Sequence, residues 1–121
     1  MSVTICEIYD LVEREGLYYK KFTDVPFTGK VEGKEQGSFK DGEKDGSWLG
    51  YWANGKLQSK TNHKNGKLEG SWVSYWRNGK LLSKGNFKNN MREGSWVDYN
   101  KDGTINKEET GTYKDGKRIS D

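Results

Sequence analysis

The chain of 121 residues is long enough for one domain, but its composition excludes several classes of protein. Only 31% of the residues are hydrophobic and 32% are charged, so the apolar runs are too short to span a membrane. Lys and Arg number 21 against 18 Asp and Glu, and this near balance gives a weak long-range field that predicts no specific recognition of nucleic acid.

The few reactive side chains narrow the range of chemistry further. Cys6 is the sole cysteine and excludes an internal disulfide framework, and the sole histidine, His63, excludes a multi-histidine metal site. We expect an ordinary, partly buried Cys6 thiol, because Ile5 stands where lipidation would require a small residue. Catalysis needs a nucleophile, a base and an orienting group in one pocket, and no pattern here indicates them. We therefore expect no enzyme activity, catalytic residue, metal or cofactor.

The first residues, 1–10, lack the cationic segment and apolar stretch of a signal peptide. Two localisations remain open: the cytoplasm, or export of a chain whose leader has been trimmed. The sequence does not decide between them.

Residues 1–28 do not follow the pattern of the later chain and are expected to form an N-terminal cap within a single domain of residues 1–121. The apolar residues between Ile5 and Val12 suit either a short helix or an irregular strand. Glu15-Gly16 separates Leu11-Val12 from Leu17-Tyr18-Tyr19 and predicts a hairpin turn. Pro26 cannot donate a ladder hydrogen bond, so it predicts a strand edge or a connecting loop.

Residues 29–121 are predicted to be repeats of about 24 residues. The stretch 46–69 reads nearly the same as 70–93, and a third, weaker copy covers about 94–116. The last copy has Asn100 where the others have Trp, which is typical of a polar terminal unit that blunts a sheet edge.

Turn signals divide the repeats into short strands. Asn-Gly and Asp-Gly favour the positive φ values of hairpin turns, and their close spacing leaves room only for antiparallel neighbours. The sequence therefore predicts an all-β fold: an elongated, twisted antiparallel β-meander built from hairpin repeats, as a single-layer sheet with the N-terminal cap. The signals are Asp41-Gly42, Asn54-Gly55, Asn65-Gly66, Asn78-Gly79, Asn89-Asn90, Asp102-Gly103 and Asp115-Gly116.

Two-residue turns at these positions also predict the register. They place Trp52 opposite Leu57, Gly50 opposite Ser59 and Trp48 opposite Thr61, and further along the chain His63 opposite Leu68 and Ser59 opposite Trp72. One face would then hold the structural core, which we expect to consist of Trp48, Trp52, Leu57, Trp72, Trp76, Leu81, Phe87 and Trp96, with His63 packed as a ring among them. The other face would hold tyrosines and lysines, and its candidate binding residues are Tyr51, Lys56, Lys60, Tyr75, Lys80, Lys84 and Tyr99.

Each face has two interpretations. The indole row is either a core or a stacking platform for a ligand, and its recurrence in every copy favours a core. The lysine rows either follow the charges of a polyanion or are a solvated surface. Acidic residues on the same face favour the solvated surface, namely Glu43, Asp45, Glu69 and Glu93.

The repeat G-S-W-x-x-Y-W-x-N-G-K-L-x-S-K-x-N-x-K-N-G, together with the leader 11–24 and Pro26-Phe27-Thr28-Gly29, resembles the bacterial MORN-like repeat of the YwqK antitoxin family. The resemblance covers about residues 10–120. It implies an elongated, twisted sheet that serves as a scaffold, and the antitoxin name implies a protein partner. It implies no particular binding residues.

We therefore expect a non-enzymatic repeat scaffold that mediates protein–protein interaction, possessing an antitoxin-like role if the resemblance extends to function. The alternative is a peripheral binder of anionic lipid head groups or another polyanion through the lysine and tyrosine face. The sequence specifies neither the partner nor the oligomeric state, nor whether the aromatic face is covered by the chain itself or by a partner.

Overall fold

The computed structural model describes the backbone of residues 5–120, and within that range it leaves out the side chains of Ile5, Cys6 and Tyr9. The prediction of a partly buried Cys6 thiol therefore lies outside the described residues.

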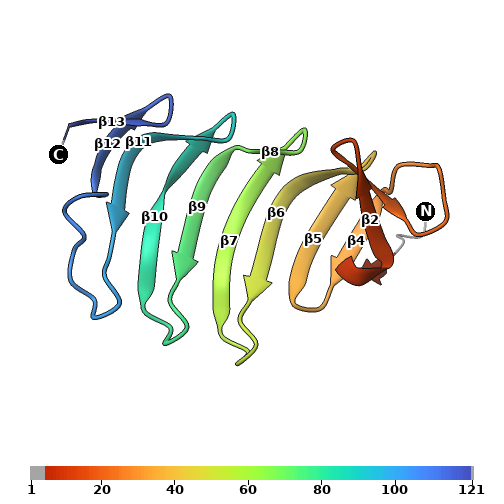
Figure 1. Ribbon diagram of the computed structural model, residues 1–121, viewed down its shortest axis with the longest axis horizontal. Coiled ribbons are helices and arrows are strands. Elements are labelled where there is room, and N and C mark those ends of the chain that lie inside the picture. Colours follow the sequence, from red (N-terminus) through yellow and green to blue (C-terminus); the bar gives the residue numbers. More distant parts are fainter. Residues whose placement is uncertain (1–4, 121) are drawn as a thin grey trace.

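Residues 5–120 form one sheet of eleven strands and a separate two-stranded hairpin. Nearly all strands of the large sheet follow one another along the chain, so they lie in a row from one end of the molecule to the other (Figure 1). The predicted all-β meander of hairpin repeats is thus confirmed, as an open single-layer sheet. The elements in chain order are β1 (Ile5–Glu7), the 3-10 turn η1 (Ile8–Asp10), β2 (Leu11–Arg14), β3 (Leu17–Lys20), β4 (Gly29–Glu32), β5 (Glu35–Lys40), β6 (Glu43–Tyr51), β7 (Leu57–Lys64), β8 (Lys67–Leu68), β9 (Gly70–Tyr75), β10 (Leu81–Lys88), β11 (Met91–Asp98), β12 (Gly111–Lys114) and β13 (Lys117–Ser120).

The first edge of the sheet departs from the antiparallel pattern. β1 pairs with β4 in parallel, with Ile5 opposite Lys30. The stretch that suited either a helix or a strand contains both, because β1 is followed at once by the 3-10 turn η1. A parallel pair needs a long crossover connection, and the β2–β3 hairpin lies within this one.

The β2–β3 hairpin covers one face of the sheet over β4 and β5 (Figure 1). Its predicted turn is present, since Glu15 and Gly16 have φ values of 50° and 83°. The ring of Tyr18 lies 4.8 Å from that of Phe39, and Phe39 lies 5.0 Å from Trp48. The cap therefore buries the beginning of the aromatic row.

The hairpin turns are of two kinds, two-residue and three-residue loops, and only the two-residue loops were predicted from the sequence. Both residues of Asn65-Gly66 have positive φ, as two-residue hairpin loops require. In Asn54-Gly55 only the glycine does; Trp52 N donates to Lys56 O and Gly55 N donates to Trp52 O, at 2.8 and 2.9 Å. These bonds define a three-residue loop that ends on a left-handed glycine. The loops at Asn78-Gly79 and Asp102-Gly103 share this geometry.

The longer loops correct part of the predicted register. Leu57 pairs with Tyr51 instead of Trp52, and an irregularity on β7 then restores the predicted pairing of Gly50 with Ser59. The same shift pairs Leu81 with Tyr75. Leu57 and Leu81 therefore lie on the tyrosine face, and their assignment to the aromatic face was wrong.

Other pairings have mixed outcomes. Trp48 lies opposite Thr61 and His63 opposite Leu68, as predicted. Ser59 pairs with Ser74, whereas the prediction paired it with Trp72, because the strand is interrupted between β8 and β9. This displacement is by two residues and leaves the faces unchanged.

Successive repeats are joined by bonds between their long loops. Trp52, Asn54 and Lys56 donate side-chain hydrogen bonds to backbone carbonyls of the next long loop, at 3.2, 3.0 and 3.3 Å. Trp52 and Trp76, predicted as core, thus lie just past the ends of β6 and β9, half-buried, and serve as connectors between repeats. One repeat later the same bonds recur from Trp76, Asn78 and Lys80.

Candidate functional site

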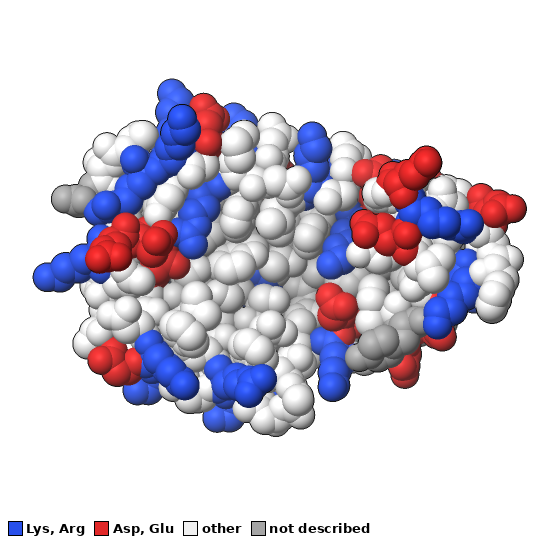
Figure 2. Space-filling view, in the orientation of Figure 1, with Lys and Arg blue, Asp and Glu red and all other residues white. Residues whose placement is uncertain are grey.

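The aromatic face is a row of rings across the sheet. The face in view in Figure 2 is the one that carries the hairpin, and it is mainly uncharged across its centre, with charged side chains gathered towards the rim. Trp48 and Trp96 are buried, as predicted for core residues, whereas Trp72 between them is half-buried. The row also includes Phe39 and Tyr113, which the sequence analysis did not assign to the core.

Each buried indole lies on a glycine of the preceding strand. A Cβ atom on Gly37 would overlap the ring of Trp48, and one on Gly85 would overlap Trp96. In both cases the indole N–H donates to the carbonyl of the residue that follows the glycine. The Trp48 N–H donates to Ser38 O at 3.0 Å, and the Trp96 N–H donates to Asn86 O at 2.9 Å. A tryptophan is therefore buried here only where the opposite strand offers bare backbone.

A central hollow of about 260 Å³ opens on this face between Trp48 and Trp72. Lys44 enters it from β6, where its ammonium lies 4.5 Å from the Trp48 ring and 3.9 Å from the Glu35 carboxylate. His63 reaches it from β7. Its lining includes Lys44, Ser59, Thr61, His63, Leu68 and Trp72.

The His63 ring is neutral near pH 7. Burial, and then the charge of Lys44, lowers its pKa from 6.5 to about 4. Its Nε2 atom is 2.9 Å from Thr61 Oγ1, whereas its buried Nδ1 atom has no partner among the described residues. The predicted packing of His63 as a ring is confirmed by its edge-on contact with Trp48, at 6.3 Å between centroids.

The opposite face, the lysine–tyrosine face, carries a row in which apolar and cationic side chains alternate. Direct cross-strand pairs place Leu49 beside Lys60, Lys60 beside Val73, and Val73 beside Lys84. Lys84 in turn pairs with Val97. The lysines of this row were predicted from the sequence, but the apolar residues between them were missed. Their fixed position one residue after each Trp could have revealed them.

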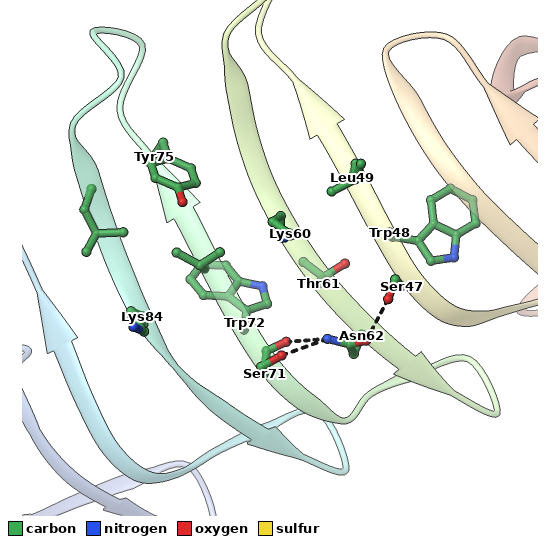
Figure 3. Close-up of a pocket in the computed structure, with 12 residues that line it drawn as sticks. Ser47, Trp48, Leu49, Lys60, Thr61, Asn62, Ser71, Trp72, Tyr75 and Lys84 are labelled. Atoms are coloured by element: carbon green, nitrogen blue, oxygen red, sulfur yellow. Dashed lines mark hydrogen bonds between the residues drawn. The ribbon is translucent and has the colours of Figure 1, made fainter.

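A groove of about 410 Å³ follows this row across β6, β7, β9 and β10 (Figure 3). Lys60, Tyr75 and Lys84 line it, together with apolar side chains that include Leu81. At one side Asn62 receives a hydrogen bond from Ser47 at 3.2 Å and donates to the Ser71 hydroxyl and carbonyl at 3.0 Å.

Two of the four acidic residues expected among the lysines bind backbone N–H groups instead. The Glu69 carboxylate accepts the backbone N–H of Asn89 at 2.9 Å, and Glu93 does the same for Asp115 at 3.2 Å. No carboxylate lines the groove, and neither Lys60 nor Lys84 has an ion pair within residues 5–120. The interpretation of this face as a solvated surface is therefore less well supported than the sequence indicated.

The predicted binding residues thus separate into three groups. Lys60, Tyr75 and Lys84 meet at the groove. Lys56 and Lys80 are held in the loops by hydrogen bonds to carbonyls. Tyr51 and Tyr99 occupy the positions of Tyr75 in the neighbouring repeats, outside the groove lining.

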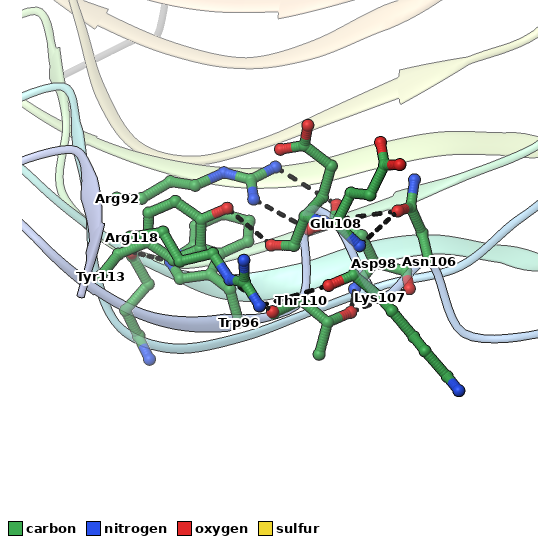
Figure 4. Close-up of polar contacts among 11 residues, drawn as sticks. Arg92, Trp96, Asp98, Asn106, Lys107, Glu108, Thr110, Tyr113 and Arg118 are labelled. Carbon is green, nitrogen blue, oxygen red and sulfur yellow. Dashed lines mark hydrogen bonds and ion pairs between the residues drawn. The ribbon is translucent and has the colours of Figure 1, made fainter. Parts of the chain in front are cut away.

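A polar cluster closes the C-terminal end of the aromatic row (Figure 4). Arg92 makes two hydrogen bonds to the buried Asp98 carboxylate, at 2.8 and 3.2 Å, and its guanidinium lies 4.1 Å from the Trp96 ring. The Tyr113 hydroxyl donates to a backbone carbonyl at 2.6 Å. These contacts fill the cluster with partners from the chain itself, so its role is structural.

The described residues contain no group of three or more His, Cys, Asp or Glu side chains placed to hold a metal ion. Among them, no helix is long and apolar enough to cross a membrane.

Comparison with known proteins gives one match. Residues 44–65 and 68–89 match the family model described as the MORN repeat variant. No curated protein and no solved structure matches the chain significantly. Each matched stretch contains the paired strands and the long loop described above. Over these two stretches the chain is similar to the MORN repeat variant, a structural repeat.

Proposed function

We propose that this chain is a non-enzymatic scaffold that binds an acidic, partly apolar segment of a protein partner in the groove of the lysine–tyrosine face. The observation that carries the proposal is the alternating row with unpaired ammonium groups and no lining carboxylate. Apolar positions in such a groove contribute burial, and the lysines select for negative charge.

The spacing of the lysines suggests the form of the segment. Lys60 and Lys84 are two strands apart, with Val73 between them, so their backbones are separated by about 10 Å. A polyproline II segment rises about 9 Å over three residues and returns to the same side. Acidic residues at every third position would therefore meet both lysines, and an apolar residue between them would contact Val73.

The test uses a synthetic proline-rich peptide with Glu at every third position, followed by fluorescence anisotropy. The peptide is expected to bind the full chain and to lose binding to the Lys60→Glu/Lys84→Glu variant. The control is Lys64→Glu/Lys88→Glu, which makes the same charge change further along the same strands and should retain binding. A peptide with Glu at every fourth position should bind more weakly. Equal loss in both variants would show general charge attraction and count against the groove.

Anionic lipid is the rival occupant, because its head groups would also attract the lysines. Vesicles containing phosphatidylserine provide the comparison, with neutral vesicles as the control. Binding to anionic vesicles without binding to the peptide would overturn the proposal in favour of the lipid surface. Both kinds of binding weaken with salt, so the salt dependence alone does not separate them.

An antitoxin-like role is a special case of this function. The resemblance to the bacterial YwqK family suggests that the partner is a toxin carrying the acidic segment. Copurification of such a toxin is expected to depend on Lys60 and Lys84 and to be unaffected by Lys64→Glu/Lys88→Glu.

A further inference from the structure

Three turns of the chain contain Asn-Gly, a pair that can react with itself: Asn54-Gly55, Asn65-Gly66 and Asn78-Gly79. The glycine nitrogen can attack the asparagine side-chain amide, because glycine has no side chain to obstruct the approach. A folded turn must first open to bring these two groups together. The reaction therefore depends on how firmly each turn holds its asparagine and its glycine N–H.

The long loops hold both reacting groups. Asn54 accepts the Lys56 N–H through Oδ1 at 2.9 Å and donates through Nδ2 to a carbonyl of the next long loop at 3.0 Å. The Gly55 N–H donates to Trp52 O at 2.9 Å. The same three bonds recur one repeat later around Asn78-Gly79.

The turn at Asn65-Gly66 is held much less. It is one of four two-residue turns along the edge of the sheet opposite the long loops (Figure 1). The Asn65 side chain is exposed and makes no hydrogen bond within residues 5–120. The Gly66 N–H donates to Lys44 O at 3.3 Å, beyond the usual range for such bonds. The corresponding bonds of the other three turns are shorter, at 2.7, 3.0 and 3.1 Å.

This turn also lacks a cap that the other three possess. Their first N–H donates to a side-chain oxygen of Thr28, Glu69 or Glu93, at 2.8, 2.9 and 3.2 Å. Asp45 occupies the position of the two glutamates, but its side chain is one methylene shorter. Among the described residues, no side chain accepts the Asn65 N–H.

The same turn lies next to an interruption of the aromatic row. Position 61 corresponds to Gly37 and Gly85 in the neighbouring repeats but holds Thr61, so Trp72 cannot lie flat on the opposite strand as the buried indoles do. Within residues 5–120, ring contacts run from the N-terminal cap as far as His63 and resume at Trp72, with none between these two rings. The turn connects the two sides of this gap, so little packing opposes its opening.

We propose that Asn65 is a site of spontaneous deamidation, and that the long loops protect Asn54 and Asn78 from the same reaction. The Gly66 nitrogen gives up its proton and bonds to Cγ of Asn65, the Cγ–Nδ2 bond breaks, and ammonia leaves with a proton. Water then opens the five-membered succinimide at one carbonyl to aspartate or at the other to isoaspartate. The net reaction consumes one water and releases one ammonia, with no change of oxidation state.

Both products weaken the turn. Each adds a carboxylate close to Glu43, whose Oε2 lies 2.7 Å from the place a Cβ atom on Gly66 would take. Isoaspartate also adds a methylene to the main chain of a loop in which both residues have positive φ. The site lies outside the groove lining and is independent of the acidic segment proposed above.

The test incubates the full native chain at mildly alkaline pH and follows each site by mass spectrometry. Chymotrypsin cleaves after aromatic residues and Leu, so the three sites fall into separate peptides, 53–57, 58–68 and 77–81. The mass gained when OH replaces NH2 marks conversion, and fragmentation distinguishes Asn65 from Asn62. Since each net hydrogen bond shifts an opening equilibrium by about fivefold, Asn65 is expected to convert at least about tenfold faster than the other two sites.

The same chain unfolded in urea is the matched control, because all three asparagines are followed by Gly-Lys. In urea the three sites should convert at similar rates. Equal rates in the native chain, faster conversion at Asn54 or Asn78, or an advantage of Asn65 that persists in urea would overturn the proposal. So would a native Asn65 that stays intact while the unfolded chain reacts.

The Asp45→Glu variant tests the cause. Its longer carboxylate should accept the Asn65 N–H, as Glu69 does in the next repeat, and slow conversion at Asn65 by about fivefold. Unchanged slow conversion at Asn54 and Asn78 shows that the variant is folded. Slower hydrogen exchange at the Asn65 N–H reports that the cap has formed. If the cap forms and Asn65 still converts at the wild-type rate, the proposal is wrong.

Discussion

The bare backbone beneath an indole decides how deeply each tryptophan is buried. Trp96 is 1% exposed above Gly85, and Trp48 is 3% exposed above Gly37. A single side chain at that position, Thr61, is enough to lift the third indole from the sheet. One methyl group is thus a large change at these positions, because packed interiors do not yield freely.

Gly85→Ala is expected to lower the free energy of unfolding by about 1–3 kcal/mol, because the added methyl group overpacks the site of Trp96. Urea unfolding followed by tryptophan fluorescence measures the change. The control is Gly50→Ala, where the added Cβ would meet the Ser59 hydroxyl at 3.2 Å and the end of the Gln58 side chain at 3.8 Å, and the next repeat already has Ser74 at this position. Equal losses in the two variants would contradict the interpretation.

Asp98→Ala is expected to cost about 3 kcal/mol, because it leaves Arg92 partly buried beside Trp96 without its counter-charge. The Asp98 side chain is 8% exposed and that of Arg92 is 24% exposed, which places the loss at the lower end of the range for buried pairs. Ser74→Ala, at the matching position one repeat earlier, removes a buried hydroxyl without a partner and should be neutral or stabilising. Urea unfolding of both variants provides the measurement, and a stable Asp98→Ala variant would refute the structural role of the pair.

His63 predicts a pH dependence of stability. Its pKa is about 4 in the folded chain against an ordinary 6.5, so the unfolded state binds more protons between these values. The free energy of unfolding should therefore fall as the pH is lowered from about 6.5 to about 4, and this contribution should not change further below that range. Denaturation of the wild type and His63→Phe at pH 7 and 4.5 isolates the effect. The variant should lose less stability than the wild type.

At the scale of elements, the loops hold the repeats in register. Asn78 uses both ends of its amide: Oδ1 accepts the N–H of Lys80 within its own loop, and Nδ2 donates to Lys101 O in the next repeat. Asp102, the counterpart in the last repeat, accepts both the N–H and the hydroxyl of Thr104, at 2.9 and 2.6 Å, within its own loop. Asn78 therefore makes one bond inside its loop and one between repeats, whereas both bonds of Asp102 lie inside its loop.

Asn78→Asp is expected to lower the free energy of unfolding by about 1 kcal/mol, because it keeps the acceptor for the Lys80 N–H but loses the donor to Lys101 O in the next repeat. Thermal unfolding of the variant and the wild type provides the comparison. Equal stability of the two would mean that the bond to Lys101 O contributes little.

The strands and turns could be predicted from the sequence because each signal is local. Asn-Gly pairs mark hairpin turns, yet both loop lengths place Gly at positive φ, so the dipeptide did not reveal the three-residue loop around Asn54. The faces of Leu57 and Leu81 depended on that length and were assigned wrongly. The groove lysines Lys60 and Lys84 were found by their repetition. The hollow was missed because the effect of Thr61 depends on which side chain crosses the opposite strand.

At the scale of the whole molecule, the interrupted row divides the packed rings into two clusters. One extends from the N-terminal cap to His63, and the other runs from Trp72 to Tyr113. The sheet is continuous between them, but ring packing is not. Since a repeat array is stabilised mainly by nearest-neighbour contacts, its weakest junction lies between β7 and β9.

Native-state hydrogen exchange is expected to show two cooperative units that meet between β7 and β9. Amides of β5–β6 and of β10–β11 should be the most protected, because they flank Trp48 and Trp96. Thr61→Gly should strengthen the junction and bring the two units closer in stability. A single unit with uniform protection would contradict this division.

The hydrogen bonds between long loops have the same kinds of donor and acceptor at each junction between repeats. They do not depend on how many repeats come before or after that junction. A copy of residues 70–93 inserted after Glu93 would present the same indole, amide and ammonium donors to the same carbonyls as its neighbours do. The number of repeats is therefore free to vary in descent by duplication, and with it the length of the groove.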